Sequence, residues 1–233
     1  MRYVDTRTEV VFNVADGAPF QTGEQLARVT GPARSVLTGE RVALNLIQRL
    51  SGIATATAHY VHAAGGAIGA KGEPVRIADT RKTTPGLRVL ERYAVRCGGG
   101  YNHRNTLSDA VMAKDNHLAL LGTGAELTAQ LKAAKARLGH TVHFEVEIDS
   151  LNQLDAVLAA GVDTIMLDNF SVEDLRTGVQ RINGAAYVEA SGGITLESIA
   201  DIASTGVDVI SSGALTHGVR SLDLGLDAVI NRG

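Results

Sequence analysis

The residues best suited to chemistry come in short groups, each placed directly after a run of apolar residues. In chain order these groups are Asp79-Thr80-Arg81-Lys82, Lys114-Asp115-Asn116-His117, Glu147, Asp168-Asn169, Ser191-Gly192-Gly193 and Ser211-Ser212-Gly213. Cations come first, carboxylates follow, and glycine–serine loops come last. This order indicates a site that holds a small anionic substrate together with a phosphate group.

The two glycine–serine loops are the most informative of these groups. Glycine lets a backbone approach an anion closely, and serine adds a hydroxyl donor. In (β/α) barrels, the loops after the last two strands often bind phosphate through backbone N–H groups. Residues 191–193 and 211–213 stand at those two places. His217 follows the second loop closely enough to contact the same phosphate.

Glu147 and Asp168 end two successive apolar runs. Magnesium takes one or two protein carboxylates and fills its remaining positions with phosphate oxygens and water. The pair could therefore share Mg²⁺ or bind sugar hydroxyls. The alternative is that either carboxylate forms a salt bridge with a nearby cation.

A cluster of cations needs an anion to bind. It comprises Arg81, Lys82, Arg104 and Lys114, together with His103 and Arg41. The planar arginine fork binds a carboxylate through two bonds, whereas lysine acts as a mobile point charge. A substrate with several carboxylates or phosphates would satisfy so many donors. Arg88, Arg92 and Arg96, spaced four apart, are instead interpreted as a solvated helix face.

The charge distribution supports a local anion site. The net charge is −3, but the 39 residues from Arg76 to Lys114 carry eight bases and three acids, so the rest of the chain is −8. Hydrophobic content of 45% indicates a globular protein, and 4% aromatic content without Trp argues against a nucleic-acid platform. A single cysteine and no apolar run of membrane length favour a cytoplasmic protein with no membrane partner.

The elements that must position these groups alternate between strands and helices. Strands are predicted at 75–79, 111–114, 142–147, 164–168, 186–191 and 207–211, with helical patterns between them. Such alternation predicts βαβ units around a parallel sheet. Gly161-Val162-Asp163 and Gly206-Val207-Asp208 repeat 45 residues apart, and no G-x-G-x-x-G follows the first clear strand. We therefore expect an irregular (β/α) barrel and not a Rossmann sheet.

The N-terminal part has a different pattern. Residues 1–38 are β-rich, and apolar residues at helical spacing predict a helix from about 40 to 62. We expect a partial N-terminal α/β sandwich domain over 1–48, a catalytic barrel over 49–218, and a helical segment over 219–233 that packs back on the N-terminal domain. The predicted helix caps are Thr84, Ser150, Ser171 and Thr195, with left-handed glycines at Gly161 and Gly206.

Eight collinear blocks of the chain resemble the quinolinate phosphoribosyltransferase family. They are D-T-R-K-T-T-P-G-L-R (79–88), A-V-R-C-G-G-G-Y-N-H-R (94–104), K-D-N-H (114–117), E-R-V-A-L-N-L-I-Q-R-L-S-G-I-A-T (40–55), E-V-E-I-D-S (145–150), I-M-L-D-N (165–169), E-A-S-G-G-I (189–194) and S-G-A-L-T-H (212–217). The resemblance implies that quinolinate and phosphoribosyl pyrophosphate (PRPP) give nicotinate mononucleotide, pyrophosphate and CO₂, with Mg²⁺, in de novo NAD synthesis.

The resemblance also assigns roles, block by block. The quinolinate-binding residues it implies are Thr80, Arg81, Lys82, His103, Arg104 and Lys114, with Arg41 lent by the neighbouring subunit of a homodimer or a higher homo-oligomer. Glu147 and Asp168 match the carboxylates on the ribose and metal side, where the metal contact could be indirect. The 5′-phosphate loops are Ser191-Gly192-Gly193 and Ser211-Ser212-Gly213, with His217 close by. Lys82, Lys114, Glu147 and Asp168 are the residues expected to act in catalysis.

The chain departs from the family pattern at its start, where the opening helices and first strand of the N-terminal domain are missing. Two explanations stay open: Met1 is not the natural start, or the small domain is reduced. Two other functions also stay open. One is a related phosphoribosyltransferase that acts on nicotinate or belongs to the molybdenum-associated paralogues. The other is a dimer that binds a phosphate ligand without catalysis.

Overall fold

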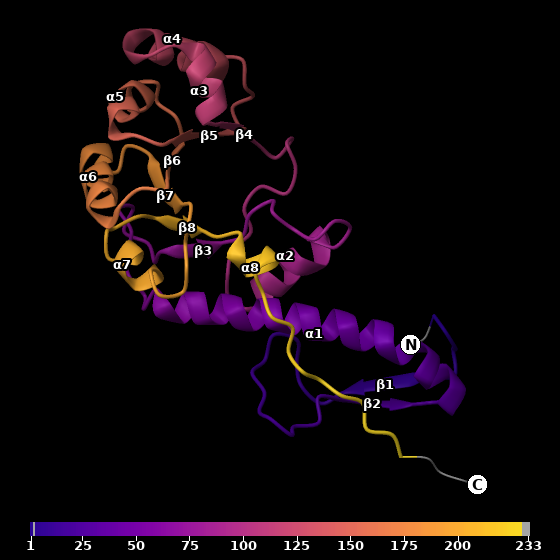
Figure 1. The fold of residues 1–233 in the computed structure, drawn as a ribbon. Coiled ribbons are helices and arrows are strands. Elements are labelled where there is room, and N and C mark those ends of the chain that lie inside the picture. Colours follow the sequence, from indigo (N-terminus) through magenta and orange to yellow (C-terminus); the bar gives the residue numbers. More distant parts are fainter. Residues whose placement is uncertain (2, 230–233) are drawn as a thin grey trace.

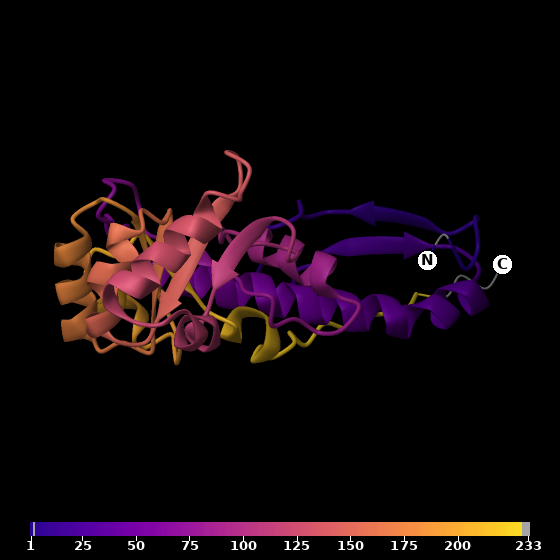
Figure 2. The ribbon, with the colours of Figure 1, turned by 90° about the horizontal axis from the view of Figure 1, so that it is seen from above.

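The computed structural model describes residues 1 and 3–229 and begins with a hairpin and one long helix (Figure 1). Strand β1 (Glu9–Phe12) pairs antiparallel with β2 (Ala27–Thr30). Helix α1 (Ala33–Ala63) confirms the predicted helix but starts earlier, directly after Pro32. Figure 2 shows the hairpin lying beside the N-terminal half of α1, away from the barrel.

The rest of the chain alternates strands and helices. In order these are β3 (Arg76–Ala78), α2 (Arg88–Cys97), β4 (Ala110–Ala113), α3 (Asp115–Leu121), α4 (Gly124–Lys135), β5 (His143–Ile148), α5 (Leu151–Ala159), β6 (Thr164–Asp168), α6 (Val172–Ile182), β7 (Tyr187–Ser191), α7 (Ile199–Ala203), β8 (Val209–Ser211) and α8 (Ala214–His217). The six strands form a parallel sheet in the order β3-β8-β7-β6-β5-β4. The sheet curves into an open barrel with helices outside it, which confirms the predicted fold class (Figure 1). No helix in the described part of the chain is long and apolar enough to cross a membrane.

The barrel is open between β3 and β4, and the segment from Tyr101 to Ala110 spans this side. Tyr101 bridges to Ala78 beside β3, and its N–H donates to Ile77 O at 2.7 Å. Three residues later, the Arg104 guanidinium donates to Ala110 O on β4 at 3.1 Å. The segment after α2 therefore connects the two free edges of the sheet.

Alternation along the strands separates the core from the barrel interior. On β5, Phe144, Val146 and Ile148 are at most 1% exposed and pack in the hydrophobic core. The intervening residues Glu145 and Glu147 face the other side, because successive strand side chains point in opposite directions. The interior of this barrel is therefore polar, whereas the hydrophobic core lies between sheet and helices.

Two of the four predicted helix caps are confirmed. Ser150 and Ser171 cap α5 and α6, and each side chain accepts a backbone N–H bond. Thr84 was a wrong prediction, because its hydroxyl and N–H both bond Glu91 and a turn precedes the first residue of α2. Thr195 was wrong too, since its N–H donates to Ser198, after which α7 begins. Gly161 and Gly206 have the predicted positive φ.

The helix predicted for 219–233 is not found in residues 219–229, and residues 230–233 lie outside the described residues. This segment instead runs extended along α1. Leu222 N–H donates to Gln48 O at 3.0 Å, and the Gln48 side chain donates to Leu224 O at 2.7 Å. Leucines at 222, 224 and 226 alternate with exposed residues, a period of two that is typical of extended chain.

Candidate active site at the C-terminal edge of the barrel

The strand ends of β4, β5 and β6 bring a cation and two carboxylates to one edge of the sheet. Lys114 follows β4 and pairs through Nζ with Glu147 Oε2 on β5. Glu147 is 8% exposed, while Lys114 is exposed, so the pair reaches from the barrel interior to solvent. Asp168, at the end of β6, accepts a hydrogen bond from the Asn169 side chain at 2.7 Å.

The loop after β7 is held against the end of β6. Asn169 N–H donates to Ser191 O at 2.8 Å. Gly192 has φ +84°, and a Cβ there would stand 2.3 Å from Asn169 Oδ1. Only glycine allows this close approach, so the loop backbone and the residue that orients Asp168 are packed together.

The loop after β8 lies beside Lys82. A Cβ on Gly213 would stand 2.9 Å from Lys82 Cδ and 2.9 Å from His217 Nε2. Thr216 Oγ1 donates to Lys82 O at 2.6 Å, and Ser212 N–H donates to Ala78 O at 3.0 Å. The structure therefore brings together Lys82, His217 and the second glycine–serine loop.

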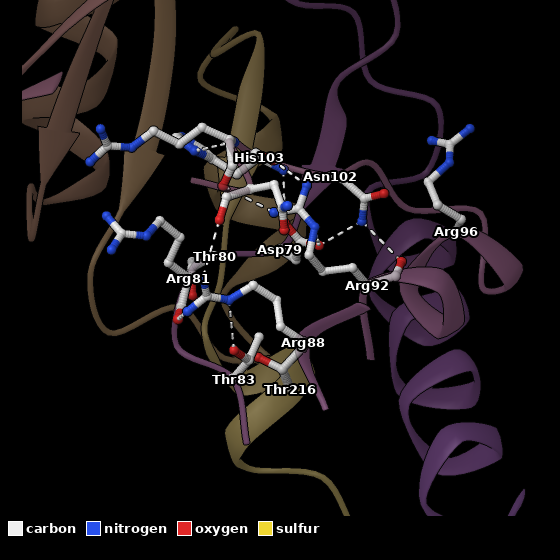
Figure 3. A network of polar contacts seen from close by, with 12 residues as sticks. Asp79, Thr80, Arg81, Thr83, Arg88, Arg92, Arg96, Asn102, His103 and Thr216 are labelled. Carbon is white, nitrogen blue, oxygen red and sulfur yellow. Dashed lines mark hydrogen bonds and ion pairs between the residues drawn. The ribbon is translucent and has the colours of Figure 1, made fainter. Parts of the chain in front are cut away.

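The remaining cations enter from β3 and from the segment after α2 (Figure 3). Arg81 Nε is buried and has no hydrogen-bond partner among the described residues. Thr80 Oγ1 accepts the Lys82 N–H at 3.1 Å, which shapes the turn that carries both cations. Arg104 bonds Ala110 O and contacts Met112 Sδ at 3.4 Å, and it is partly buried.

Three residues inside the barrel form a cluster in which sequence reasoning had named only one member. His103 Nε2 lies 3.3 Å from Glu145 Oε2 and 3.5 Å from Glu189 Oε1. Burial lowers the pKa of His103, but the two carboxylates outweigh it and raise the pKa to about 10. Burial likewise raises the pKa of Glu145. A cavity of about 550 Å³, lined by these three residues and by the first residues of the strands, lies on their N-terminal side.

This cluster has the composition of a metal site, with ligand atoms within 4.8 Å of one another. The hydrogen bonding argues for a proton there instead. His103 Nδ1 accepts the Arg104 N–H at 2.9 Å, so the neutral ring carries its hydrogen on Nε2. The imidazolium also keeps that hydrogen. In both states Nε2 faces the carboxylates as a donor, which leaves no lone pair for a metal.

The predicted Mg²⁺ residues Glu147 and Asp168 offer oxygen ligands, as magnesium requires. Glu147 stands one residue before the end of β5 and Asp168 ends the neighbouring strand β6, at the edge where the glycine–serine loops lie. Two carboxylates with positions left for water and phosphate oxygens fit this ion. Their role in metal binding stays a prediction.

Arg41 lies apart from the barrel that carries the other predicted site residues. It lies on the half of α1 that extends beyond the barrel, and its side chain is 69% exposed. Its nearest charged partner is the adjacent Glu40, at 3.8 Å. Within one chain, Arg41 therefore joins none of the other site residues.

The solvated helix face predicted for Arg88, Arg92 and Arg96 was wrong for two of the three residues. Arg92 is 9% exposed and its Nε lies 3.7 Å from buried Asp79. Arg88 is partly buried and donates to Thr83 Oγ1 at 3.1 Å (Figure 3).

Sequence reasoning also missed Glu145 and Glu189. The signal available was the period of two: Glu145 precedes Glu147 by two residues, and Glu189 precedes Ser191 by two.

An open parallel (β/α) barrel with cations, carboxylates and glycine–serine loops at its C-terminal edge defines a barrel enzyme for phosphorylated substrates. Comparison with known protein families identifies which family of barrel enzymes this is. The profile of the quinolinate phosphoribosyl transferase C-terminal domain matches residues 53–227, and that of the N-terminal domain matches residues 2–51. The chain belongs to the quinolinate phosphoribosyltransferase family.

Named relatives agree with this assignment. The chain is 47% identical over 228 residues to a probable carboxylating nicotinate-nucleotide pyrophosphorylase from Bacillus subtilis, covering 98% of this chain and 76% of the relative. It is 48% identical to the Mycobacterium leprae enzyme of that name, covering 94% of this chain and 74% of the relative. A solved nicotinate-nucleotide pyrophosphorylase from Ehrlichia chaffeensis superposes with a TM-score of 0.88 at 35% identity, covering 97% of this chain and 79% of that one. The chain thus spans about three quarters of its relatives' length.

Proposed function

We propose that this protein transfers the phosphoribosyl group of PRPP to the ring nitrogen of quinolinate and releases the 2-carboxylate as CO₂. The products are nicotinate mononucleotide, pyrophosphate and CO₂, the reaction of de novo NAD synthesis. Membership of the family and the nicotinate-nucleotide pyrophosphorylase names of its relatives support this reaction.

The cation cluster supports binding of a dicarboxylate. Arg81 has a buried Nε without a partner among the described residues. Lys114 follows the C-terminal end of β4, and Arg104 bonds Ala110 O at the start of that strand. Hydrogen bonds to charged groups contribute about 1.5–3 kcal/mol each, so several donors would hold two adjacent carboxylates firmly. We place Thr80 and His103 with this group, as the family resemblance implies.

The glycine–serine loops and Lys82 support binding of the phosphoribosyl donor. Backbone N–H groups of residues 191–193 and 211–213 would hold the 5′-phosphate. Lys82 and His217 lie against Gly213, so the Lys82 ammonium and the His217 ring would face the same donor. Mg²⁺, held by Glu147 and Asp168 directly or through water, would supply charge neutralisation at the pyrophosphate.

The reaction needs two bond exchanges. The bond from ribose C1 to pyrophosphate oxygen breaks, its electron pair leaves with pyrophosphate, and the pyridine nitrogen forms the new bond to C1. Glu147 and Asp168 would stabilise the positive charge that develops on the ribose, while Lys82 and Lys114 would offset charge on the leaving group. The bond to the 2-carboxylate then breaks, the alkylated ring accepts the electron pair, and the ring carbon takes up a proton.

The observation that carries this proposal is the contact of Lys82 with Gly213 and Thr216, because it joins the cation-bearing end of β3 to the glycine–serine loop of β8. The test is to supply PRPP and Mg²⁺ with either quinolinate or nicotinate. We expect equal amounts of nicotinate mononucleotide, pyrophosphate and CO₂ from quinolinate only. Product from nicotinate alone would favour the related transferase, and no product from either would favour a non-catalytic phosphate-binding protein.

Replacing Arg104 with Ala tests the dicarboxylate side of the site. We expect turnover to fall by about 10² or more, because substrate orientation contributes at least that much to such reactions. The far-ultraviolet circular dichroism should stay unchanged. Near-normal production of nicotinate mononucleotide by this variant would exclude the assigned role.

We include a homodimer, or a higher homo-oligomer, in the proposal. Arg41 extends away from its own barrel and is exposed, which suits a residue lent to a neighbouring subunit. A cytoplasmic location also stays part of the proposal and rests on the single cysteine.

A further inference from the structure

We propose that the buried Asp79–Arg92 ion pair is a positioning device that fixes the backbone of residues 102–104 and so positions His103 and Arg104, the two residues of this segment that the proposed function assigns to quinolinate. This inference rests on the proposed function for the identity of the substrate. The positioning itself can be measured without any substrate.

The Asp79 carboxylate accepts one backbone N–H and one side-chain amide from the segment 102–104. Its Oδ1 accepts the His103 N–H at 2.7 Å, and its Oδ2 accepts the Asn102 side-chain amide at 2.6 Å (Figure 3). The same amide donates to Arg92 O at 2.9 Å, which joins the segment to α2. Asp79 directly follows β3 and is 0% exposed, so these acceptors are fixed to the sheet.

The Arg92 guanidinium donates to two backbone carbonyls of the same segment. Its Nη1 donates to Arg104 O at 3.0 Å, its Nη2 donates to His103 O, and its Nε lies 3.7 Å from Asp79 Oδ2. One guanidinium thus binds the carbonyls of His103 and Arg104 and faces the carboxylate that binds the His103 N–H. A planar fork can do this, whereas a lysine ammonium cannot reproduce its geometry.

The energetics of the pair favour a role in positioning over one in stability. Removing two charges from water costs several kcal/mol for each ion, and a buried pair often gives no net stabilisation over an apolar one. Burial raises the pKa of Asp79 in spite of its hydrogen bonds and its cationic neighbours. What the pair does supply is a fixed backbone geometry at His103 and Arg104.

The segment needs this support because it lies on the open side of the barrel. Of the described residues from 101 to 109, Tyr101 alone forms a bridge to β3, and β4 begins at Ala110. Between them, Arg104 crosses to Ala110 O with its side chain. Without the ion pair, residues 102–104 lose the bonds to one N–H and two carbonyls.

The test uses Arg92→Lys, which keeps the charge but removes the fork, and Asp79→Asn, which keeps the shape but removes the charge. Arg96→Lys is the matched control, because Arg96 lies on the same helix, is exposed, and contacts Gly100 O and the Tyr101 ring, which lie outside residues 102–104. Hydrogen–deuterium exchange over residues 101–106, thermal unfolding, and the kcat and KM for each substrate are measured for all variants.

We expect faster exchange over 101–106 in both variants and a KM for quinolinate raised roughly tenfold or more, since misplaced binding groups lose substrate affinity. The KM for PRPP should stay within about twofold, and Arg96→Lys should match the wild type in every measurement. Unchanged exchange would overturn the proposal. Equal losses for both substrates would also overturn it, because they would indicate general destabilisation. Faster exchange in the two variants, together with a wild type that makes no product, would instead refute the proposed function alone.

Discussion

At the scale of single residues, the most consequential side chain is His103. Its ring contacts two buried carboxylates through Nε2 and the backbone of Arg104 through Nδ1. These contacts compete, because protonation of Nδ1 removes the acceptor for the Arg104 N–H. Two charge-assisted contacts at about 1.5–3 kcal/mol each outweigh one neutral hydrogen bond of about 1 kcal/mol, so we expect the imidazolium at neutral pH.

The titration of His103 tests this balance. Its pKa is raised from 6.5 to about 10, so the stabilisation is fully present below pH 6.5 and is lost as the pH rises towards 10. We expect the free energy of unfolding of the wild type, relative to His103→Gln, to fall across that interval. Nuclear magnetic resonance should place the ring titration near pH 10. A midpoint near 6.5, with the Arg104 amide still bonded to Nδ1 at neutral pH, would contradict the prediction.

At the scale of elements, strand ends and tight loops bring the substrate-binding groups together. The β7 loop shows this most directly, because Gly192 and Asn169 could not approach as they do if residue 192 had a side chain. Asn169 itself has φ 59° and bonds Asp168. The loop geometry and the orientation of the carboxylate are therefore linked.

Gly192→Ala should raise the KM for PRPP several-fold while changing the KM for quinolinate little, because the new methyl displaces Asn169 and with it Asp168. The matched control is Gly193→Ala, which has a similar positive φ of +57° but a nearest neighbouring atom 3.9 Å from the new Cβ. Both variants carry the left-handed backbone cost of about 1–2 kcal/mol. Equal kinetic effects in the two would show that backbone strain, not the contact with Asn169, is responsible.

At the scale of the whole molecule, α1 connects two parts with different roles. Its C-terminal half packs against β3 and α2, while its N-terminal half carries the hairpin and Arg41 away from the barrel (Figures 1 and 2). Residues 219–224 run back along this helix, and a Cβ on Gly52 would stand 2.3 Å from Arg220 O. The predicted subunit exchange of Arg41 depends on this extended shape.

Mixing two inactive variants tests that exchange. If Arg41 serves the neighbouring subunit, dimers formed between Arg41→Ala and Arg104→Ala chains contain one intact site. Random reassociation should then restore about a quarter of the wild-type activity, because half of the dimers are mixed and each has one working site. Activity that stays at the level of the separate variants would show that Arg41 does not act across the interface.

The sequence by itself determined the alternation of strands and helices, the polar groups at the strand ends and the family. These follow from local patterns: periodicity, glycine positions and short motifs. The same rules failed at residues 219–229, where bonds to α1 favour an extended chain. They also failed at Arg92, where helical spacing indicated a solvated face but the buried carboxylate of Asp79, directly after β3, pairs with it.

Only the tertiary structure decided which polar residues meet. Asp79 and Arg92 are 13 residues apart, and Glu145 and Glu189 lie on strands separated by β6. Their contacts depend on how the sheet curves and on where the segment 101–104 closes its open side. A motif reports which residue types are present, but partners brought together by folding set their charge, protonation and orientation.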